Sequence, residues 1–270
     1  MPRARKPPPL ALTIAGSDSG GGAGIQADLR SFAALAVHGL SAITAITAQN
    51  TRGVSAIQMA SPAVLQAQLD AVFDDFTIAA VKTGMLGTPV SVRTVARCIA
   101  ARKPRWVVVD PVLIATTGAA LARGGVVDTI RRLLVPLAHL LTPNVPEAEQ
   151  LLDRRIADRA GLLDAAHALR GLGARAVLLK GGHLPGRRVH DVLVDSDGSV
   201  HWFSHSRVGI EGHGTGCSLA AAITALLARG SSLDEAVAGA IEFVHRALLL
   251  AYRPGRGTLA VLDHMGARLG

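Results

Sequence analysis

Apolar runs alternate with segments of helical period along most of the chain. Six runs predict strands: Leu10–Gly16, Ser41–Gln49, Ile78–Thr83, Trp106–Asp110, His139–Thr142 and Ala176–Lys180. Most of these runs are continuous, as expected for strands of a parallel sheet that is buried on both faces. Five segments between them have helical period: Ile25–Val37, Pro62–Phe73, Pro89–Ala101, Gly125–Leu134 and Gly161–Gly171. The alternation predicts an α/β fold, with a mostly parallel central sheet and helices on both faces.

The pattern changes after Lys180. The segments Arg188–Val194 and Val200–Ser206 flank a turn sequence at 195–198, which predicts a small β-hairpin. Two long helices are predicted to begin near Gly216 and near Ser232. Because no repeat or linker divides the chain, we expect residues 10–265 to form a single domain. Residues 1–9, which are basic and proline-rich, are expected to form a flexible tail.

Composition narrows the classes of protein. The chain is 49% hydrophobic, enough for a large core, but no apolar run approaches the length of a membrane span. The two cysteines, Cys98 and Cys217, lack zinc-site spacing and favour the cytoplasm. The net charge is +8, yet the basic residues are scattered and aromatic residues make up 3%. Nucleic-acid binding is therefore not expected, and anionic substrates explain part of the charge.

Polar or glycine-rich sequences follow all six predicted strands. Ligands of open α/β sheets bind at the carboxyl ends of the strands, so these sequences are expected to meet at one site. The segments, in chain order, are Gly16–Gly24, Gln49–Arg52, Lys82–Met85, Asp110–Val112, Thr142–Glu147 and Lys180–His183. A polar or glycine-rich sequence after a single strand would be weak evidence for a site. Six of them predict a functional site.

A second glycine-rich turn leads directly into an alanine-rich helix at Gly212–Ile223. Backbone amides at such a turn, with the positive end of the helix dipole, suit the charge that develops in phosphoryl transfer. Cys217 lies where the helix begins, where a thiolate would be stabilised and could accept a proton from an attacking hydroxyl. Close packing of small residues at a helix terminus is the alternative interpretation. Among the histidines, only His213 is expected near the site.

Three further strand ends have both functional and local interpretations. Asp110 is placed to hold Mg²⁺ through water, or it simply forms an Asp-Pro turn. Asn144 and Glu147 have the spacing of a helix cap and its capping-box partner, which is compatible with a role at a metal. Lys180, followed by two glycines, could meet a nucleotide phosphate or end a strand in a plain turn.

The first glycine-rich loop also matches a loose dinucleotide-binding pattern through Gly22, Gly24 and Ala27. That fingerprint requires an acidic residue about 20 positions further on, to bind ribose. No aspartate or glutamate lies between Asp28 and Asp70, which disfavours NAD. Arg52 leaves an NADP-binding oxidoreductase as a distant alternative.

Together these motifs resemble the ribokinase-like superfamily, and within it the hydroxymethylpyrimidine and phosphomethylpyrimidine kinases of thiamine biosynthesis. The resemblance runs from about Leu10 to Leu262, and a cysteine in place of the aspartate of sugar kinases is similar to this branch. The matching segments are Leu12–Asp28, Ala45–Val54, Lys82–Leu86, Asp110–Val112, Leu141–Ala148, Leu179–His183 and His213–Cys217. Such a resemblance implies a ribokinase-like fold, a cytoplasmic location and a homodimer.

The resemblance also implies a reaction: phosphorylation by ATP and Mg²⁺ of 4-amino-5-hydroxymethyl-2-methylpyrimidine, and then of its monophosphate. The residues that it implies are, for the pyrimidine, Ala23, Asp28, Gln49, Met85 and Val112; for catalysis, Gly214, Thr215, Gly216 and Cys217; for the nucleotide, Asn144, Lys180, Gly182 and Thr215; and for Mg²⁺, Asp110 and Glu147. The chain departs from many relatives at Ala115–Gly118, where Thr116 replaces a lysine. If that lysine holds a phosphate, the second phosphorylation is affected.

Two other functions stay open at this stage. A pyridoxal or pyridoxine kinase is the nearest alternative, because its ring and hydroxymethyl acceptor are similar in size. A binding protein without catalytic activity is the most distant alternative. Six polar or glycine-rich strand ends, together with a glycine-rich turn suited to phosphate, exceed what binding alone requires.

Overall fold

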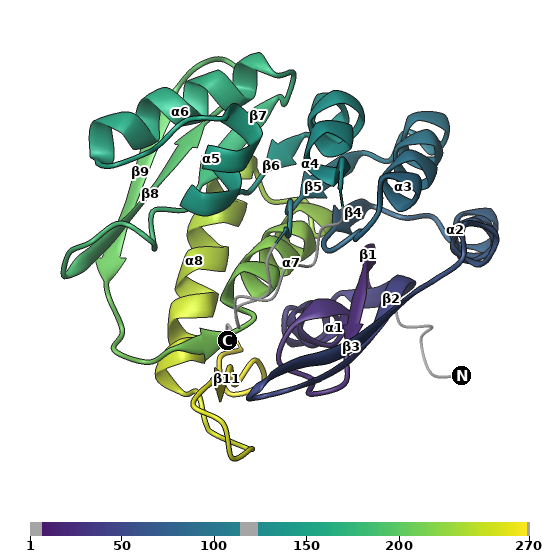
Figure 1. Cartoon of the computed structure of the whole chain (residues 1–270), viewed down its shortest axis with the longest axis horizontal. Coiled ribbons are helices and arrows are strands. Elements are labelled where there is room, and N and C mark those ends of the chain that lie inside the picture. Colours follow the sequence, from purple (N-terminus) through teal and green to yellow (C-terminus); the bar gives the residue numbers. More distant parts are fainter. Residues whose placement is uncertain (1–6, 114–123, 269–270) are drawn as a thin grey trace, which may run out of the picture.

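The computed structural model of the chain describes residues 7–113 and 124–268. Within these residues the main sheet has nine strands in the order β3-β2-β1-β4-β5-β6-β7-β8-β9 (Figure 1). Strands β2, β1, β4, β5, β6 and β7 are parallel, as the continuous apolar runs predict. The strands are β1 Leu10–Asp18, β2 His38–Asn50, β3 Gly53–Met59, β4 Ala80–Thr83, β5 Trp106–Val109, β6 Leu140–Leu141, β7 Ala176–Leu179, β8 Arg188–Val194 and β9 Val200–Ser206.

Antiparallel strands form both edges of this sheet. The predicted hairpin is confirmed as β8 and β9, whose bounds match the expected ones. Strand β3 was not predicted, and it pairs antiparallel with β2. Its apolar residues Val54, Ile57 and Met59 are separated by polar or small ones, so it lacks the continuous run of a strand buried on both faces. A separate pair, β10 Gly212–His213 with β11 Ala260–Val261, was also not predicted.

Several helices begin where side-chain oxygens cap free backbone amides, whereas α1, α4 and α7 begin without such a cap. Ser61, Thr88 and Asp158 each accept a hydrogen bond from an amide in the first turn of the following helix. The predicted helix over 125–134 is short α4 followed by a π turn. The helices are α1 Gly24–Ala34, α2 Pro62–Asp75, α3 Pro89–Arg102, α4 Val126–Thr129, α5 Val145–Leu152, α6 Arg159–Gly171, α7 Thr215–Ala228 and α8 Leu233–Leu249.

Two hydrophobic cores lie on opposite faces of the sheet. Helices α2 to α6 cover one face, and α1, α7 and α8 cover the other (Figure 1). Successive residues of a strand point to opposite faces, so in β5 Val107 and Val109 enter the first core and Val108 the second. The ribokinase-like α/β class predicted from the sequence is confirmed.

The strand order places a crevice at the carboxyl edge of the sheet. The chain leaves β1 for β2 on one side and later returns to β4 on the other side of β1. Loops at this reversal diverge, and the resulting crevice is where such sheets bind ligands. None of the helices within the described ranges is long and apolar enough to cross a membrane.

Candidate active site

The first glycine-rich loop is held by Asp18, at the end of β1. Backbone amides of Gly20, Gly22 and Ala23 donate to its carboxylate at 2.8, 3.0 and 2.9 Å. Burial alone would raise the pKa of Asp18, but hydrogen bonds, chiefly from His213 and Ala23, lower it below its ordinary value. Because Asp18 already takes these amides, the loop does not offer them to a pyrophosphate. The dinucleotide-binding alternative is not supported by this geometry.

The two glycine-rich loops are in close contact. Gly214, which caps α7, has a φ of 80°, and a Cβ there would overlap the carbonyl oxygen of Gly22. A Cβ on Gly22 would in turn overlap the His213 ring. Only glycine allows this approach. As a result, α7 begins beside the first loop, and its first amides, which have no acceptor within the helix, face the crevice.

A lysine–aspartate pair joins two strand ends across the same crevice. Lys180 Nζ lies 3.1 Å from Asp110 Oδ1, and the two side chains are 13% and 2% exposed. Burial would lower the pKa of Lys180, but Asp110 and Glu147 outweigh it and raise the pKa above its ordinary value. Lys180 is therefore a charged ammonium group at the edge of the cavity.

Asn144 and Glu147 form the capping box that their spacing predicts. The Asn144 side chain accepts from the Glu147 amide, and the Glu147 carboxylate accepts from the Asn144 amide, both at 2.9 Å. Burial raises the pKa of Glu147 to about 7, although Lys180 acts in the opposite direction. The cap fixes a titratable carboxyl group near Asp110 on the rigid start of α5.

A second lysine–aspartate pair lies beneath the crevice. Lys82 Nζ is 2.8 Å from Asp28 Oδ2, both side chains are 0% exposed, and Thr13 Oγ1 donates to Asp28 at 2.6 Å. Asp28 does not line the cavity, so this geometry does not support its predicted role in binding substrate. Its carboxylate is used instead to pair with a buried ammonium group, because a buried charge requires such a partner.

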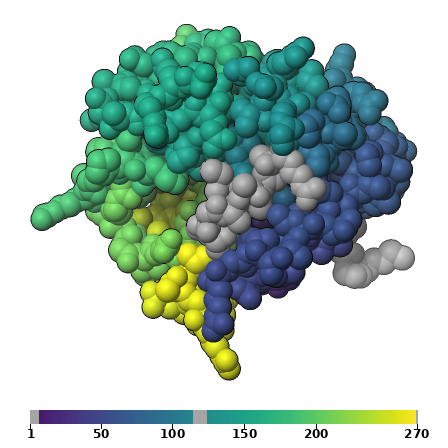
Figure 2. Space-filling model, viewed as in Figure 1, coloured from purple at the N-terminus to yellow at the C-terminus, as the bar shows by residue number. Residues whose placement is uncertain are grey.

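One cavity of about 640 Å³ joins these elements. Figure 2 shows a hollow in the surface of the molecule, beside the β8–β9 hairpin and the C-terminal segment. All other predicted site residues line the cavity: Ala23, Gln49, Met85, Asp110, Val112, Asn144, Glu147, Lys180, Gly182, Gly214, Thr215, Gly216 and Cys217. His213 lines it too, as expected. Thr116 lies outside the described residues.

The thiol of Cys217 differs from its predicted state. It was expected to be stabilised as a thiolate at the start of α7, but burial raises its pKa to about 11, against the opposing effect of Lys82. The loss of hydration outweighs the helix dipole and the ammonium group. Before substrates bind, the residue is therefore a neutral thiol at neutral pH.

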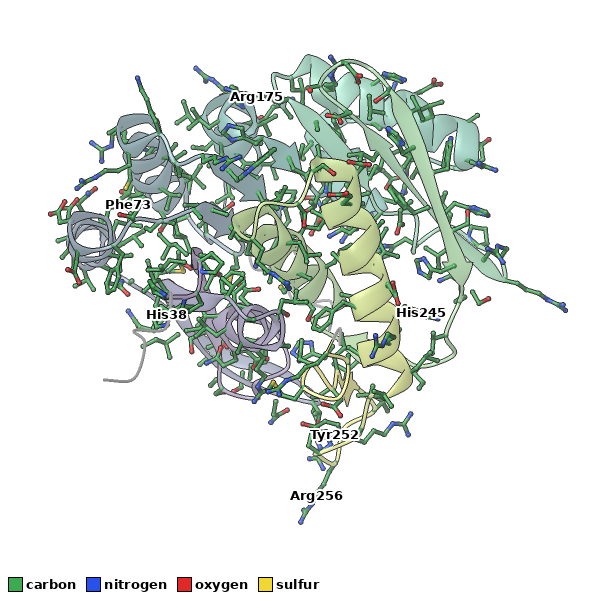
Figure 3. The ribbon with its side chains drawn as sticks, turned by 180° about the vertical axis from the view of Figure 1, so that it is seen from behind. His38, Phe73, Arg175, His245, Tyr252 and Arg256 are labelled. Atoms are coloured by element: carbon green, nitrogen blue, oxygen red, sulfur yellow. The ribbon has the colours of Figure 1, made fainter. Side chains whose placement is uncertain are left out.

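Sequence reasoning missed several residues of the cavity. Asp18 lies inside the Leu12–Asp28 motif but was assigned no role. An acidic residue at the end of a buried strand is itself an indication of a functional site. Asp191 interrupts the apolar strand β8, where it accepts from the Gly181 amide at 2.8 Å. His205 and His245 come from distant segments, with ring centroids 5.6 Å apart, and His245 extends from α8 in Figure 3. No sequence signal links these two histidines.

Amides at a helix start, a thiol beside them and a lysine–aspartate pair in one cavity define a small-molecule kinase with a ribokinase-like fold. A model of the family described as phosphomethylpyrimidine kinase matches residues 18–262. The chain therefore belongs to the phosphomethylpyrimidine kinase family, as its sequence resemblance implied.

Individual relatives agree with this assignment. The chain is 47% identical to a hydroxymethylpyrimidine/phosphomethylpyrimidine kinase of Rhizobium meliloti, with 92% of this chain and 95% of the relative covered. It is also 47% identical to the thiamine biosynthesis bifunctional protein ThiED of Geobacter sulfurreducens, with 94% of this chain and 52% of that protein covered. The chain thus spans about half the length of the bifunctional relative.

Solved structures show two related classes of kinase. An ADP complex of Bacillus subtilis pyridoxal kinase has a TM-score of 0.89 at 33% identity, covering 97% of this chain and 100% of that one. A phosphomethylpyrimidine kinase from Clostridium difficile has a TM-score of 0.79 at 39% identity, covering 88% and 98%. Sequence is therefore nearer to the pyrimidine kinase of these two, and overall shape nearer to the pyridoxal kinase.

Proposed function

We propose that this chain phosphorylates the hydroxymethyl group of 4-amino-5-hydroxymethyl-2-methylpyrimidine and then phosphorylates the resulting monophosphate. The observation that carries the proposal is one cavity whose lining combines two kinds of group. Gln49, Met85 and Val112 provide an amide and apolar surface for a small aminopyrimidine ring. Lys180 and the start of α7 provide the positive charge and amides that phosphates require. The names of the relatives support this pair of substrates.

Cys217 lines the same cavity, and we assign it the proton of the acceptor hydroxyl. As the oxygen attacks phosphorus, its O–H bond weakens and the proton passes to the thiolate form of Cys217, which is a small fraction at neutral pH, and regenerates the neutral thiol. The amides of Gly214, Thr215 and Gly216 then stabilise charge on the transferring phosphoryl group. Phosphoryl transfer depends mainly on positioning and charge stabilisation, so these groups are chemically sufficient.

ATP and Mg²⁺ are the cosubstrate and the metal of this proposal. Asn144, Lys180, Gly182 and Thr215 would contact the nucleotide, and Asp110 with Glu147 would hold the metal. No cluster of three or more ligating side chains occurs within 7–113 and 124–268. Two carboxylates nevertheless fit Mg²⁺, which keeps several waters and takes phosphate oxygens as further ligands. Bound there, Mg²⁺ would neutralise phosphate charge.

A coupled ADP-release assay with Mg-ATP tests the proposal. The acceptors are the hydroxymethylpyrimidine, its monophosphate and pyridoxal, each at the same concentration. Turnover of both pyrimidines is the expected result and shows that Thr116 is compatible with the second step. Turnover of the first pyrimidine alone contradicts the two-step proposal and implicates Thr116. No turnover of either pyrimidine contradicts the proposed function.

Pyridoxal is the second candidate acceptor. The observation in its favour is the TM-score of 0.89 with a pyridoxal kinase over essentially its whole length. The hydroxymethyl group of pyridoxal also lies beside a ring nearly as small as a pyrimidine. In the same assay, turnover of pyridoxal alone would make it the primary substrate and leave the phosphoryl-transfer chemistry intact.

We further propose that residues 10–265 act as a single domain, that the protein works in the cytoplasm and that it forms a homodimer. Cys98 and Cys217 are both free thiols, which supports a reducing compartment. Ile46 on β2 is 63% exposed and is a candidate contact between copies. Sedimentation equilibrium of the protein and of an Ile46→Asp variant tests the dimer, which the variant should weaken.

A further inference from the structure

Three side chains from separate segments meet at Nε2 of His213. Asp18 Oδ2 lies 3.0 Å from this nitrogen, and the Gln49 amide nitrogen lies 2.8 Å from it. The other end of the Gln49 amide faces Thr47 Oγ1 at 3.4 Å. His213 Nδ1 is buried and has no hydrogen-bond partner within the part of the chain that the structure describes. The proposed mechanism uses neither His213 nor Asp18.

The charge of Asp18 determines where the His213 ring holds its proton. Asp18 is 3% exposed, accepts two further amides at the same oxygen, and has a lowered pKa, so it is an ionised acceptor. A bare Nε2 would face this carboxylate with its lone pair, and the only ring N–H would be at buried Nδ1. An unpaired buried donor is costly. A neutral ring with its hydrogen on Nε2 avoids both penalties.

That proton position in turn determines how Gln49 lies. An N–H on Nε2 cannot face the amide NH₂ of Gln49 at 2.8 Å, because both groups are donors. The nitrogen and oxygen of a carboxamide occupy nearly the same volume, so the reversed amide fits equally well. Reversed, the Gln49 oxygen shares the single Nε2–H of His213 with Asp18 as a second acceptor, and the Gln49 NH₂ donates to Thr47 Oγ1. Thr47 is free to accept, because its own hydroxyl donates to the Ser17 carbonyl at 2.9 Å.

We propose that Asp18 and His213 orient the Gln49 amide. In this orientation one N–H group of Gln49 stays free to donate a hydrogen bond to the bound substrate. This inference rests on the proposed function, in which Gln49 binds the pyrimidine. The oriented N–H recognises an acceptor atom in the ring, such as a pyrimidine nitrogen. His213 and Asp18 are thus positioning residues for substrate specificity.

The first test needs no substrate. In the ligand-free protein with ¹⁵N-labelled histidine, NMR correlates each ring nitrogen with the ring protons, and a His213→Asn variant identifies the His213 signals. We expect a hydrogen on Nε2 of His213. A ring whose only hydrogen is on Nδ1 would overturn the inference.

The second test is a double-mutant cycle between His213→Leu and Gln49→Ala. Each single variant is expected to raise KM for the pyrimidine about tenfold, the effect of one hydrogen bond. The double variant should be no worse than Gln49→Ala alone, and KM for ATP should change by less than about twofold. Effects that multiply, or an equal rise in KM for ATP, would overturn the inference.

Gln68→Ala is the matched control for this cycle. Its amide bonds the backbone of Ile43 on the same strand as Gln49 but does not line the cavity, so its KM for the pyrimidine should equal that of the wild type. If the wild type does not phosphorylate a pyrimidine, the proposed function fails, and the NMR result still decides whether Asp18 and His213 orient Gln49.

Discussion

Two lysine–aspartate pairs lie near the carboxyl edge of this sheet, and they have different environments. Lys82 and Asp28 are fully buried, 2.8 Å apart, and Thr13 provides a further hydrogen bond. Lys180 and Asp110 are 3.1 Å apart, and both line the cavity. The residue types are the same. The first pair is enclosed between β4 and α1, and the second faces the space where substrates would bind.

The difference shows what burial does to an ion pair. Burial alone would lower the pKa of Lys82, but Asp28 outweighs it and holds the ammonium group charged. Because Lys82 does not line the cavity, this charge cannot contact a substrate; it acts on the stability of the fold and, at a distance, lowers the pKa of Cys217. Lys180 is also held charged by its neighbours, yet its ammonium group reaches the cavity and can bind a phosphate.

The largest effect is expected from removing one member of the enclosed pair. Lys82→Met leaves the Asp28 carboxylate buried without its partner and should lower the free energy of unfolding by about 3–5 kcal/mol. Urea denaturation measures this change. Lys82→Met combined with Asp28→Leu should recover part of it. As a surface control, Asp74→Asn breaks an exposed pair with Arg102 and should cost less than about 1 kcal/mol. Equal losses for Lys82→Met and Asp74→Asn would contradict the distinction.

The next effect concerns catalysis on the cavity side. Cys217→Ala should fold normally and lower kcat at least about 100-fold, as expected for loss of a proton acceptor. Because burial raises the pKa of this thiol to about 11, wild-type kcat should increase as the pH is raised from neutral. A Cys217→Asp variant, ionised throughout that range, should lose the increase. An unchanged kcat in Cys217→Ala would remove this residue from the mechanism.

A third carboxylate, Asp191, accepts a backbone amide and has no lysine within ion-pair distance among the described residues. Burial raises its pKa from 3.8 to about 6, so the folded protein binds its proton more tightly than the unfolded chain does. Its contribution to stability is therefore present at low pH and is lost as pH rises through about 6. Asp191→Asn retains an oxygen that accepts from the Gly181 amide but cannot ionise. Its free energy of unfolding should therefore not show the decrease of about 3 kcal/mol that the wild type shows as the pH rises. Urea denaturation at acidic and neutral pH compares the two proteins, and parallel curves would refute this pKa.

The sequence predicted the parallel strands, the hairpin and the part of the cavity lining that comes from the strand ends and the start of α7, but not the part that comes from β8, β9 and α8. Continuous apolar runs mark strands buried on both faces, and the carboxyl ends of parallel strands must meet at one edge. It did not separate Asp28 from Asp110, because whether a residue of α1 faces the cavity depends on how α1 packs against the sheet. The raised pKa of Cys217 could not be predicted from the sequence either, because the thiol loses its hydration only when distant segments enclose it.

The contact between Asp18, His213 and Gln49 shows the same limit. Each residue belongs to a motif that was recognised, yet the three are separated by up to 195 positions along the chain. The three side chains meet at His213 Nε2 because Gly22 and Gly214 approach each other closely, and this approach requires both glycine-rich loops to be folded.

The most direct test of this account is the affinity of Lys180→Met for Mg-ATP, measured by titration calorimetry beside the wild type. Its urea midpoint should fall less than that of Lys82→Met, because Asp110, although only 2% exposed, lines the cavity whereas Asp28 does not. We predict that ATP binds at least about tenfold more weakly, since a charged hydrogen bond to phosphate is lost. An unchanged affinity for ATP, or a loss of stability as large as that of Lys82→Met, would contradict the account.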